Sequence, residues 1–348
     1  MRIGLDFRPA MMATTGIGRY VGALSRELAP RCDLRLFGVF RKGNRPAVRR
    51  APDGARLLAW PLPSRAMDLL GRLRLLPADR ALGGCDLFHH TNYWLAEVAA
   101  RTPQVWTLHD LAFLRAPELY PEPARRKLRA VVDEAVRRCA AFLVPSEETA
   151  RDCRELLGYD RVFVTPLGVA PHATTPRLGT PYLLALGTIE PRKNHRRLLQ
   201  AYATLRPDLE LHLVGRRGWH DDEVLALAAR TPGVVVRGHL PEDELRATLA
   251  GAHALLYPSL LEGFGLPVLE ANAAGVPALT SDRAPMRTDA ALCIDPTDVD
   301  AIVEGLRRII DDAPLRARLI ERGRARAGAH TWERCASETA RAYEAILA

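Results

Sequence analysis

Short apolar runs alternate with amphipathic stretches along the whole chain. The first half opens with the run RIGLDF and the helical stretch YVGALSRELAP, and the second half opens with PYLLALGT and NHRRLLQAYATL. Near-continuous apolar strands that take turns with helices predict parallel sheets whose two faces are both covered. We therefore expect an α/β fold.

Two such series predict two domains, because 348 residues exceed what one hydrophobic core usually organises. The stretch APHATTPRLGTP, rich in proline, threonine and glycine, separates the series. We expect Rossmann-like domains over residues 1–172 and 178–330, facing each other across a cleft, and a final helix over 331–348. Ligands of open α/β sheets bind beyond the carboxyl ends of the strands, so the loops after strands are the places to search for chemistry.

Composition excludes several classes of protein. Hydrophobic residues make up 48% of the chain and charged residues 26%, and no apolar run reaches the roughly 18 residues of a membrane helix. The first residues, MRIGLDFRPA, suit a strand and not a signal peptide. The six cysteines are scattered without a CxxC pair, which is typical of reduced thiols. These features predict a cytoplasmic protein.

The positive charge is confined to the first half. Residues 1–170 hold 27 Lys and Arg against 18 Asp and Glu, whereas residues 171–348 hold 22 against 23. Two basic amphipathic segments, 64–82 and 121–139, contribute to this excess. Surface helices packed on the sheet are the simpler interpretation. The alternative is peripheral contact with an anionic inner membrane surface.

The segment HALLYPSLLEGFGLPVLEANAAG carries the strongest signal of chemistry. A predicted strand ends at Ser259, a glycine-rich loop Glu262-Gly263-Phe264-Gly265 follows, and a helix opens near Pro267. Backbone N–H groups of such a loop form an anion site at a helix N-terminus. Two carboxylates, Glu262 and Glu270, flank the loop and suit hydrogen bonds from sugar hydroxyls. Acidic residues that merely complement the helix dipole would explain Glu262, but Glu270 lies beyond the first turn.

This segment resembles the E-x7-E signature of retaining glycosyltransferases of family 4, which have the GT-B fold. The likeness extends to GIGRY, TLHDL, VPSEETARD, PLGV, LGTIEPRKN and the closing TWE segment. Within the family, the chain is most similar to bacterial mannosyltransferases that build surface polysaccharides from GDP-mannose. The resemblance implies transfer of mannose from a nucleotide diphosphate sugar to a glycan or lipid-linked acceptor. It also implies that the C-terminal helix returns to the N-terminal domain, which would hold the acceptor.

By this resemblance, Glu262 faces the donor sugar and Glu270 holds the ribose. The backbone of Gly263, Phe264, Gly265 and Leu266 meets the diphosphate and the sugar. The diphosphate itself is the expected base for the acceptor hydroxyl, and closure of the domains is expected to exclude water.

A diphosphate leaving group needs positive charge in its transition state, which a Lys/Arg pair can supply without a metal. Lys193, one of three lysines in the chain, follows a strand in LALGTIEPRKN. The family usually has an arginine directly after the glycine of this strand, where this chain has Thr188. Arg192 is the nearest substitute, with Arg216 and Arg217 as further candidates. A solvated basic helix start is disfavoured because the helix dipole opposes it.

Two motifs of the first half are assigned through the same resemblance. Gly16 and Gly18 of GIGRY are expected to meet the donor phosphates and the acceptor, although turn geometry alone would explain a glycine pair. His109 of TLHDL follows a strand and is expected to contact the transferred sugar. His89 and His90 suggest a weaker version of the same role, on the acceptor side.

No metal is predicted. The histidine pair lacks a third ligand at a suitable spacing, and the D-x-D of Asp298 and Asp300 suits a helix start capped by Thr297.

Other functions remain open at this point. The donor could be a UDP- or dTDP-sugar, and a non-catalytic sugar-nucleotide-binding protein would share the fold. A nucleic-acid-binding protein would use the basic half, but the aromatic content is 6% and no recognition motif is present. A nicotinamide dehydrogenase is disfavoured because the GxGxxG fingerprint is missing.

Overall fold

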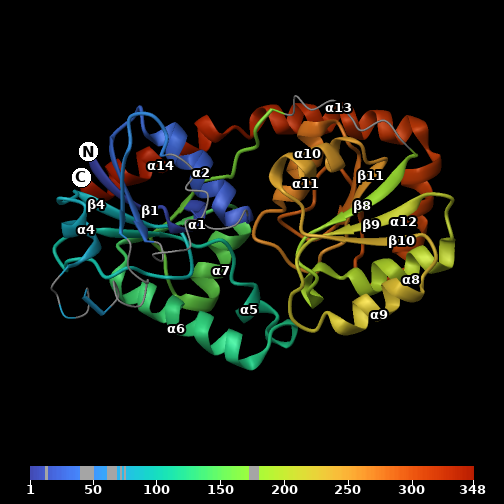
Figure 1. Ribbon diagram of the computed structural model, residues 1–348, viewed down its shortest axis with the longest axis horizontal. Coiled ribbons are helices and arrows are strands. Elements are labelled where there is room, and N and C mark those ends of the chain that lie inside the picture. Colours follow the sequence, from blue (N-terminus) through green and yellow to red (C-terminus); the bar gives the residue numbers. More distant parts are fainter. Residues whose placement is uncertain (12–14, 40–50, 61–68, 71–72, 74–75, 172–179) are drawn as a thin grey trace. The chain divides into compact units, whose positions relative to one another are not determined.

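The computed structural model describes residues 1–11, 15–39, 51–60, 69–70, 73, 76–171 and 180–348. The chain divides into two compact units (Figure 1). The first comprises Met1–Leu114, Glu122–Gly168 and Trp332–Ala348, and the second comprises Arg115–Pro121 and Val169–Thr331. Most of the connecting stretch APHATTPRLGTP lies outside the described residues.

The first unit contains a seven-stranded parallel sheet with strand order β3-β2-β1-β4-β5-β6-β7. Its middle strands β4, β5 and β6 are buried at every position, which is why they lack polar alternation. The strands are β1 (Arg2–Asp6), β2 (Asp33–Val39), β3 (Arg56–Trp60), β4 (Leu87–His90), β5 (Gln104–Thr107), β6 (Ala141–Val144) and β7 (Val162–Val164).

Two helices of the first unit begin at a residue whose side chain caps them. The Thr15 hydroxyl accepts a hydrogen bond from the Gly18 N–H at the start of α2, and Ser146 caps α7 in the same way. The last helix of the chain, α14, packs on α2, as the family resemblance predicted. The helices are α1 (Arg8–Met11), α2 (Gly16–Leu28), α4 (Ala78–Ala81), α5 (Ala112–Arg115, which ends at the border of the unit), α6 (Glu122–Arg138), α7 (Glu147–Leu157) and α14 (Trp332–Leu347).

The second unit contains a six-stranded parallel sheet with strand order β10-β9-β8-β11-β12-β13. Successive residues of β8 alternate between two hydrophobic clusters, so that Leu183 and Ala185 join one cluster and Leu184 and Leu186 join the other. The strands are β8 (Tyr182–Leu186), β9 (Glu210–Val214), β10 (Val234–Gly238), β11 (Ala254–Tyr257), β12 (Ala278–Ser281) and β13 (Leu292–Ile294).

Each of the strands β8 to β11 is followed by a helix, and two successive helices follow β13. The helices are α8 (His195–Leu205), α9 (Asp222–Arg230), α10 (Glu242–Ala250), α11 (Leu266–Ala274), α12 (Val299–Asp311) and α13 (Ala313–Ala329). In both units, therefore, the predicted parallel α/β architecture is confirmed.

Two details differ from the sequence prediction. The N-cap of α12 is Asp298, whose carboxylate accepts from the Asp300 N–H at 2.9 Å, and not Thr297, whose hydroxyl bonds to Asp295 instead. Much of the predicted basic helix 64–82 lies outside the described residues, and its described end forms only the short α4. Within the described residues, no helix is long and apolar enough to cross a membrane.

Candidate active site

Two loops at the carboxyl end of the second sheet carry the site. One follows β8 and contains the 3-10 turn η2 (Pro191–Lys193), and the other follows β11 and leads into α11. The Leu260 N–H donates to the Arg192 carbonyl at 2.8 Å. The side-chain amide of Asn194 donates to the carbonyls of Pro258, at 3.0 Å, and Pro296, at 2.6 Å. These bonds fix the two loops against each other.

Glycines shape both loops. Gly265 stands before α11 with φ of +87°, a conformation that L side chains rarely adopt. Gly187, directly after β8, has φ of +134°, and a Cβ there would approach Lys193 Cε at 3.2 Å. The side chain of Lys193 therefore runs close along the backbone at the end of β8, toward the second loop.

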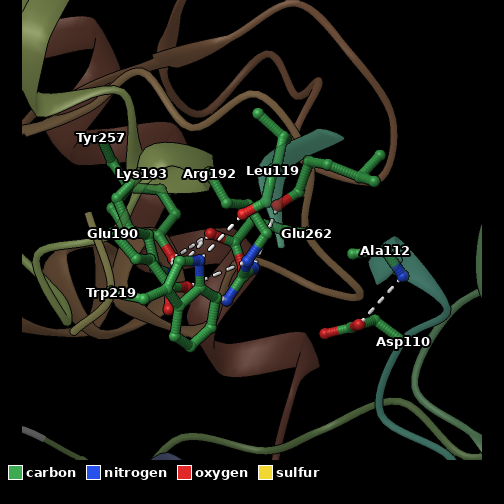
Figure 2. A network of polar contacts seen from close by, with 10 residues as sticks. Asp110, Ala112, Leu119, Glu190, Arg192, Lys193, Trp219, Tyr257 and Glu262 are labelled. Carbon is green, nitrogen blue, oxygen red and sulfur yellow. Dashed lines mark hydrogen bonds and ion pairs between the residues drawn. The ribbon is translucent and has the colours of Figure 1, made fainter. Parts of the chain in front are cut away.

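Two cations converge on the carboxylate of Glu262 (Figure 2). Lys193 Nζ donates to Glu262 Oε1 at 2.6 Å, and Arg192 Nη1 donates to Oε2 at 2.5 Å. The Tyr257 hydroxyl donates to the same Oε1 at 2.7 Å and accepts from Lys193 Nζ at 2.6 Å. The side chains of Glu262, Lys193 and Arg192 are only 8%, 11% and 13% exposed. The sequence analysis assigned Lys193 and Glu262 to the same site without predicting a contact between them, and the structure shows that they form an ion pair.

Burial and charge act in opposite directions on this cluster. Burial alone would raise the pKa of Glu262, but the charges of Arg192 and Lys193 and the hydrogen bonds from Lys193 and Tyr257 lower it to about 2. Burial lowers the pKa of Lys193, against the attraction of Glu262. Burial also raises the pKa of the Tyr257 hydroxyl well above its usual range. At neutral pH the site thus holds an ionised carboxylate beside a neutral phenol.

The three arginines considered for the second cation have different partners in the structure. Arg192 lies in the cluster, whereas Arg217 pairs with Asp221 and Asp222 at 2.8 and 2.7 Å. Arg216 is exposed and contacts His239 at 3.3 Å. Thr188 stands at the position where the resemblance predicted arginine. The Thr188 methyl group lies against Gly218, where an added Cβ would be 2.8 Å from it.

The remaining predicted donor residues of this unit lie on the second loop and α11. Gly263 and Gly265 are buried, and Phe264 packs against His330 with ring centroids 6.0 Å apart. Leu266 is the first residue of α11, and Glu270 is half-buried in its second turn. The N-terminus of α11 therefore lies directly beyond the glycine-rich loop, as predicted.

Three predicted residues lie in the first unit. Gly16 and Gly18 are in the first turn of α2, where a Cβ on Gly18 would come within 2.8 Å of the Pro9 carbonyl oxygen. His109 follows β5, and its Nε2 lies 3.0 Å from the Thr91 carbonyl oxygen. Because a carbonyl only accepts, Nε2 carries the proton, and burial lowers the pKa of the ring. Neutral His109 thus keeps Nδ1 as a hydrogen-bond acceptor.

The suggestion that His89 and His90 line the acceptor side is wrong. Both residues are fully buried in β4, where His89 bonds to the Tyr343 hydroxyl at 2.6 Å and to Thr107 Oγ1 at 2.7 Å. His90 bonds to Gln104 at 2.9 Å. Burial lowers the pKa of each ring to about 3, so both are neutral structural histidines. The sequence LFHH by itself does not show whether its histidines are buried in the core or line a binding site.

We expect Tyr343→Phe to lower the free energy of unfolding by about 1–3 kcal/mol, because His89 Nδ1 loses its partner in a buried position. Urea denaturation at neutral pH measures the change. Nucleotide binding should remain as in the wild type, since Tyr343 belongs to the core of the first unit. An unchanged free energy of unfolding would show that the bond from α14 to β4 does not stabilise the fold.

Sequence reasoning missed Tyr257 and Glu190. Tyr257 is the last residue of β11, and Glu190 lies in the same loop as Lys193. Both lie at or just after the carboxyl end of a strand, where functional residues were expected, so this expectation could have identified them. Among the described residues, no group of three or more His, Cys, Asp or Glu is arranged to hold a metal ion.

Family models match both halves of the chain. A model described as glycosyl transferases group 1 matches residues 171–326, and a model of glycosyltransferase family 4 matches residues 14–173. The O-antigen chain mannosyltransferase B of Escherichia coli is 32% identical, with 99% of this chain and 100% of that protein covered. The MMP alpha-(1->4)-mannosyltransferase of Mycolicibacterium hassiacum is 30% identical, with 100% and 99% covered.

Solved structures show the same fold at lower identity. Sucrose-phosphate synthase from Thermosynechococcus elongatus matches with a TM-score of 0.82 at 21% identity, over 99% of each chain. WaaG, a glycosyltransferase involved in lipopolysaccharide biosynthesis, matches with a TM-score of 0.72 at 19% identity, over 98% of each chain.

Proposed function

The chain belongs to glycosyltransferase family 4 and is a sugar-transferring enzyme of the GT-B fold, and from this premise we propose that it moves mannose from GDP-mannose, with retention of configuration, to a glycan or lipid-linked acceptor in bacterial surface polysaccharide or glycolipid synthesis. The printed activities of the two mannosyltransferase relatives support this donor sugar. A UDP- or dTDP-sugar donor is the alternative.

One observation carries the proposal: Lys193 and Arg192 converge within 2.6 Å of Glu262, at the end of the sheet where nucleotides bind in such folds. Two fixed cations can stabilise the negative charge that develops on a leaving diphosphate, and they act most strongly in a site that excludes water. We assign Glu262 to the sugar, Glu270 to the ribose, and the backbone of 263–266 to the diphosphate. No metal has a part in this mechanism.

We assign His109 to the transferred sugar as well. Its neutral ring offers the Nδ1 lone pair, since Nε2 is used by the Thr91 carbonyl. Such a nitrogen can accept a hydrogen bond from a sugar hydroxyl. The diphosphate oxygen remains the proposed base, because the buried carboxylate of Glu262 is held by two cations.

We expect nucleotides to raise the melting temperature of the protein selectively. The panel is GDP, GDP-mannose, UDP-glucose, UDP-N-acetylglucosamine and dTDP-rhamnose, with EDTA present. A ligand at 100 times its Kd adds about 2.7 kcal/mol to the free energy of unfolding, which thermal unfolding detects. Stabilisation by GDP and GDP-mannose, lost in Glu270→Ala and Lys193→Ala, would support the donor and metal-free binding.

Stabilisation by another nucleotide would keep the enzyme class and replace the donor, and no response would contradict the proposed donor site. A non-catalytic sugar-nucleotide-binding protein is distinguished by turnover. Only an enzyme releases the nucleoside diphosphate from its donor, by transfer or by slow hydrolysis.

We also propose peripheral contact of the first unit with an anionic membrane surface. Leu69 and Leu73 are each 58% exposed and are joined by an i,i+4 backbone hydrogen bond. In α6, in contrast, several arginines form ion pairs with acids of their own helix, which favours the surface-helix interpretation there. Sedimentation with vesicles containing phosphatidylglycerol should exceed sedimentation with phosphatidylcholine vesicles, and Leu69→Ser/Leu73→Ser should reduce sedimentation with both.

A further inference from the structure

Glu190 is a buried carboxylate to which none of the roles above is assigned. It is 5% exposed and stands directly before the 3-10 turn that carries Arg192 and Lys193. Its Oε1 accepts hydrogen bonds from Arg192 Nε at 3.1 Å and Nη2 at 2.8 Å. The third nitrogen of the same guanidinium, Nη1, donates to Glu262 and, at 3.0 Å, to the Leu261 carbonyl. Each edge of the guanidinium thus meets a different carboxylate (Figure 2).

We propose that Glu190 is a positioning residue for sugar transfer: its carboxylate holds the Nε and Nη2 edge of Arg192, so that Nη1 faces Glu262 and the positive charge of the guanidinium stays beside the proposed diphosphate site. This inference rests on the proposed function. It assigns a role to Glu190 of the LGTIEPRKN motif, to which the family resemblance assigned none.

The backbone around Glu190 is well supported for such a task. The Ile189 N–H donates to the Arg216 carbonyl at 2.9 Å, which ties this loop to the segment after β9. A Cβ at Gly218 would lie 2.6 Å from the Ile189 carbonyl oxygen and 3.3 Å from Glu190 Cβ, so the two loops are in close contact. A carboxylate on a fixed backbone can hold a long, flexible arginine in one orientation.

The position of Arg192 gives a positioning residue a task. Thr188 stands directly after the strand glycine, and the cation comes from Arg192, four residues further along in the 3-10 turn. Its planar, fork-shaped head group offers two usable edges, and Glu190 occupies one of them. The other edge is left to act at Glu262.

Charge compensation also favours Glu190. Lys193 and Arg192 carry two buried positive charges against the single negative charge of Glu262, and Glu190 makes the cluster neutral. An ordinary buried ion pair that stabilises the loop is the competing explanation. The two explanations differ in what they predict for turnover, because a positioning residue acts only through Arg192.

The test compares Glu190→Gln, Glu190→Asp, Arg192→Gln and the double variant Glu190→Gln/Arg192→Gln with the wild type. GDP release from GDP-mannose gives kcat and KM, with UDP release from UDP-glucose used instead if the nucleotide panel favours UDP. Calorimetric binding of the same diphosphate and the melting temperature are measured alongside. Glu223→Gln is the matched control, since Glu223 forms an exposed ion pair with Arg196 in the same unit.

We expect Glu190→Gln to lower kcat roughly 10- to 100-fold, because a displaced guanidinium no longer meets the developing charge. Glu190→Asp should restore part of kcat, and Glu223→Gln should leave it unchanged. In the Arg192→Gln background, Glu190→Gln should have no further effect. The inference is overturned if the two substitutions multiply, or if Glu190→Gln lowers only the melting temperature.

A second measurement needs only the folded wild type and one variant. Burial raises the pKa of Glu190, against the charges of Arg192 and Lys193 and with the repulsion of Glu262. As the pH falls through this raised pKa, Glu190 becomes neutral and releases Arg192, so kcat of the wild type should decrease on the acid side. Glu262, with a pKa of about 2, cannot cause this decrease. A decrease that persists unchanged in Glu190→Gln would contradict the proposal.

The binding data separate this inference from the function on which it rests. A wild type that binds neither GDP nor UDP contradicts the proposed donor site as a whole. A wild type that binds and turns over, with a Glu190→Gln variant that matches it in kcat, overturns only the role of Glu190.

Discussion

Glu262→Gln should reduce sugar transfer by about two to three orders of magnitude while nucleoside diphosphate binding becomes tighter. Glutamine keeps the size of the side chain but removes the charge that we assign to the donor sugar. The same carboxylate now neutralises Lys193 and Arg192, at 2.6 and 2.5 Å. Its loss leaves both cations available to a diphosphate, so the variant separates binding from turnover.

Calorimetric titration with GDP and UDP measures the first part of this prediction, and release of the diphosphate from the donor measures the second. We expect Kd to fall about tenfold, equivalent to about 1.4 kcal/mol. Weaker binding in Glu262→Gln would mean that the carboxylate helps to build the diphosphate site instead of competing for its cations. Glu223→Gln, at an exposed pair, should change neither quantity.

Lys193→Met should lower turnover strongly and also destabilise the fold. Methionine fills the space along Gly187 but provides no charge for the leaving diphosphate, which predicts a loss of kcat of about 100- to 1,000-fold. Removing one partner of a buried ion pair typically costs about 3–5 kcal/mol. Because Arg192 and Tyr257 still bond to Glu262, we expect the lower end of this range.

Urea denaturation and nucleotide titration measure the two consequences of Lys193→Met separately. Lys127→Met is the matched control, because Lys127 is exposed on α6 in the first unit. The control should keep its stability, its nucleotide affinity and its turnover. Turnover in Lys193→Met within tenfold of the wild type would show that Arg192 alone carries the leaving-group charge.

The partners within the site follow from contacts between distant segments. Arg192 and Glu262 are 70 positions apart in the chain, and nothing near either residue indicates that they touch. The departure at Thr188 left three arginines as candidates, and only the packing of the β8 and β11 loops separates Arg192 from Arg216 and Arg217. The sequence did not single out Glu190, because an acidic residue next to Arg192 and Lys193 is also typical of a turn exposed to solvent.

In the first unit, too, the local sequence did not show which histidines are available to a ligand. His89 and His109 both lie at the carboxyl end of the first sheet, and their local sequences gave them similar candidate roles. Tyr343 and Thr107 occupy both nitrogens of His89, whereas a backbone carbonyl occupies one nitrogen of His109. Residues Arg115–Pro121 cluster with the second unit, where Trp219 Nε1 donates to the Leu119 carbonyl at 2.8 Å. No periodicity in the sequence predicts this assignment.

The sequence by itself determined those features that depend on residues close together in the chain. Uninterrupted apolar runs require strands buried on both faces, and a glycine is needed at Gly265, where φ is positive. The spacing of Glu262 and Glu270 matches the signature of the family. The tertiary structure alone decided which charges meet, which histidines are buried, and that Glu190 and Tyr257 belong to the cluster. Electrostatic strength depends on distance and burial, and both are set by segments that approach only after the sheet has formed.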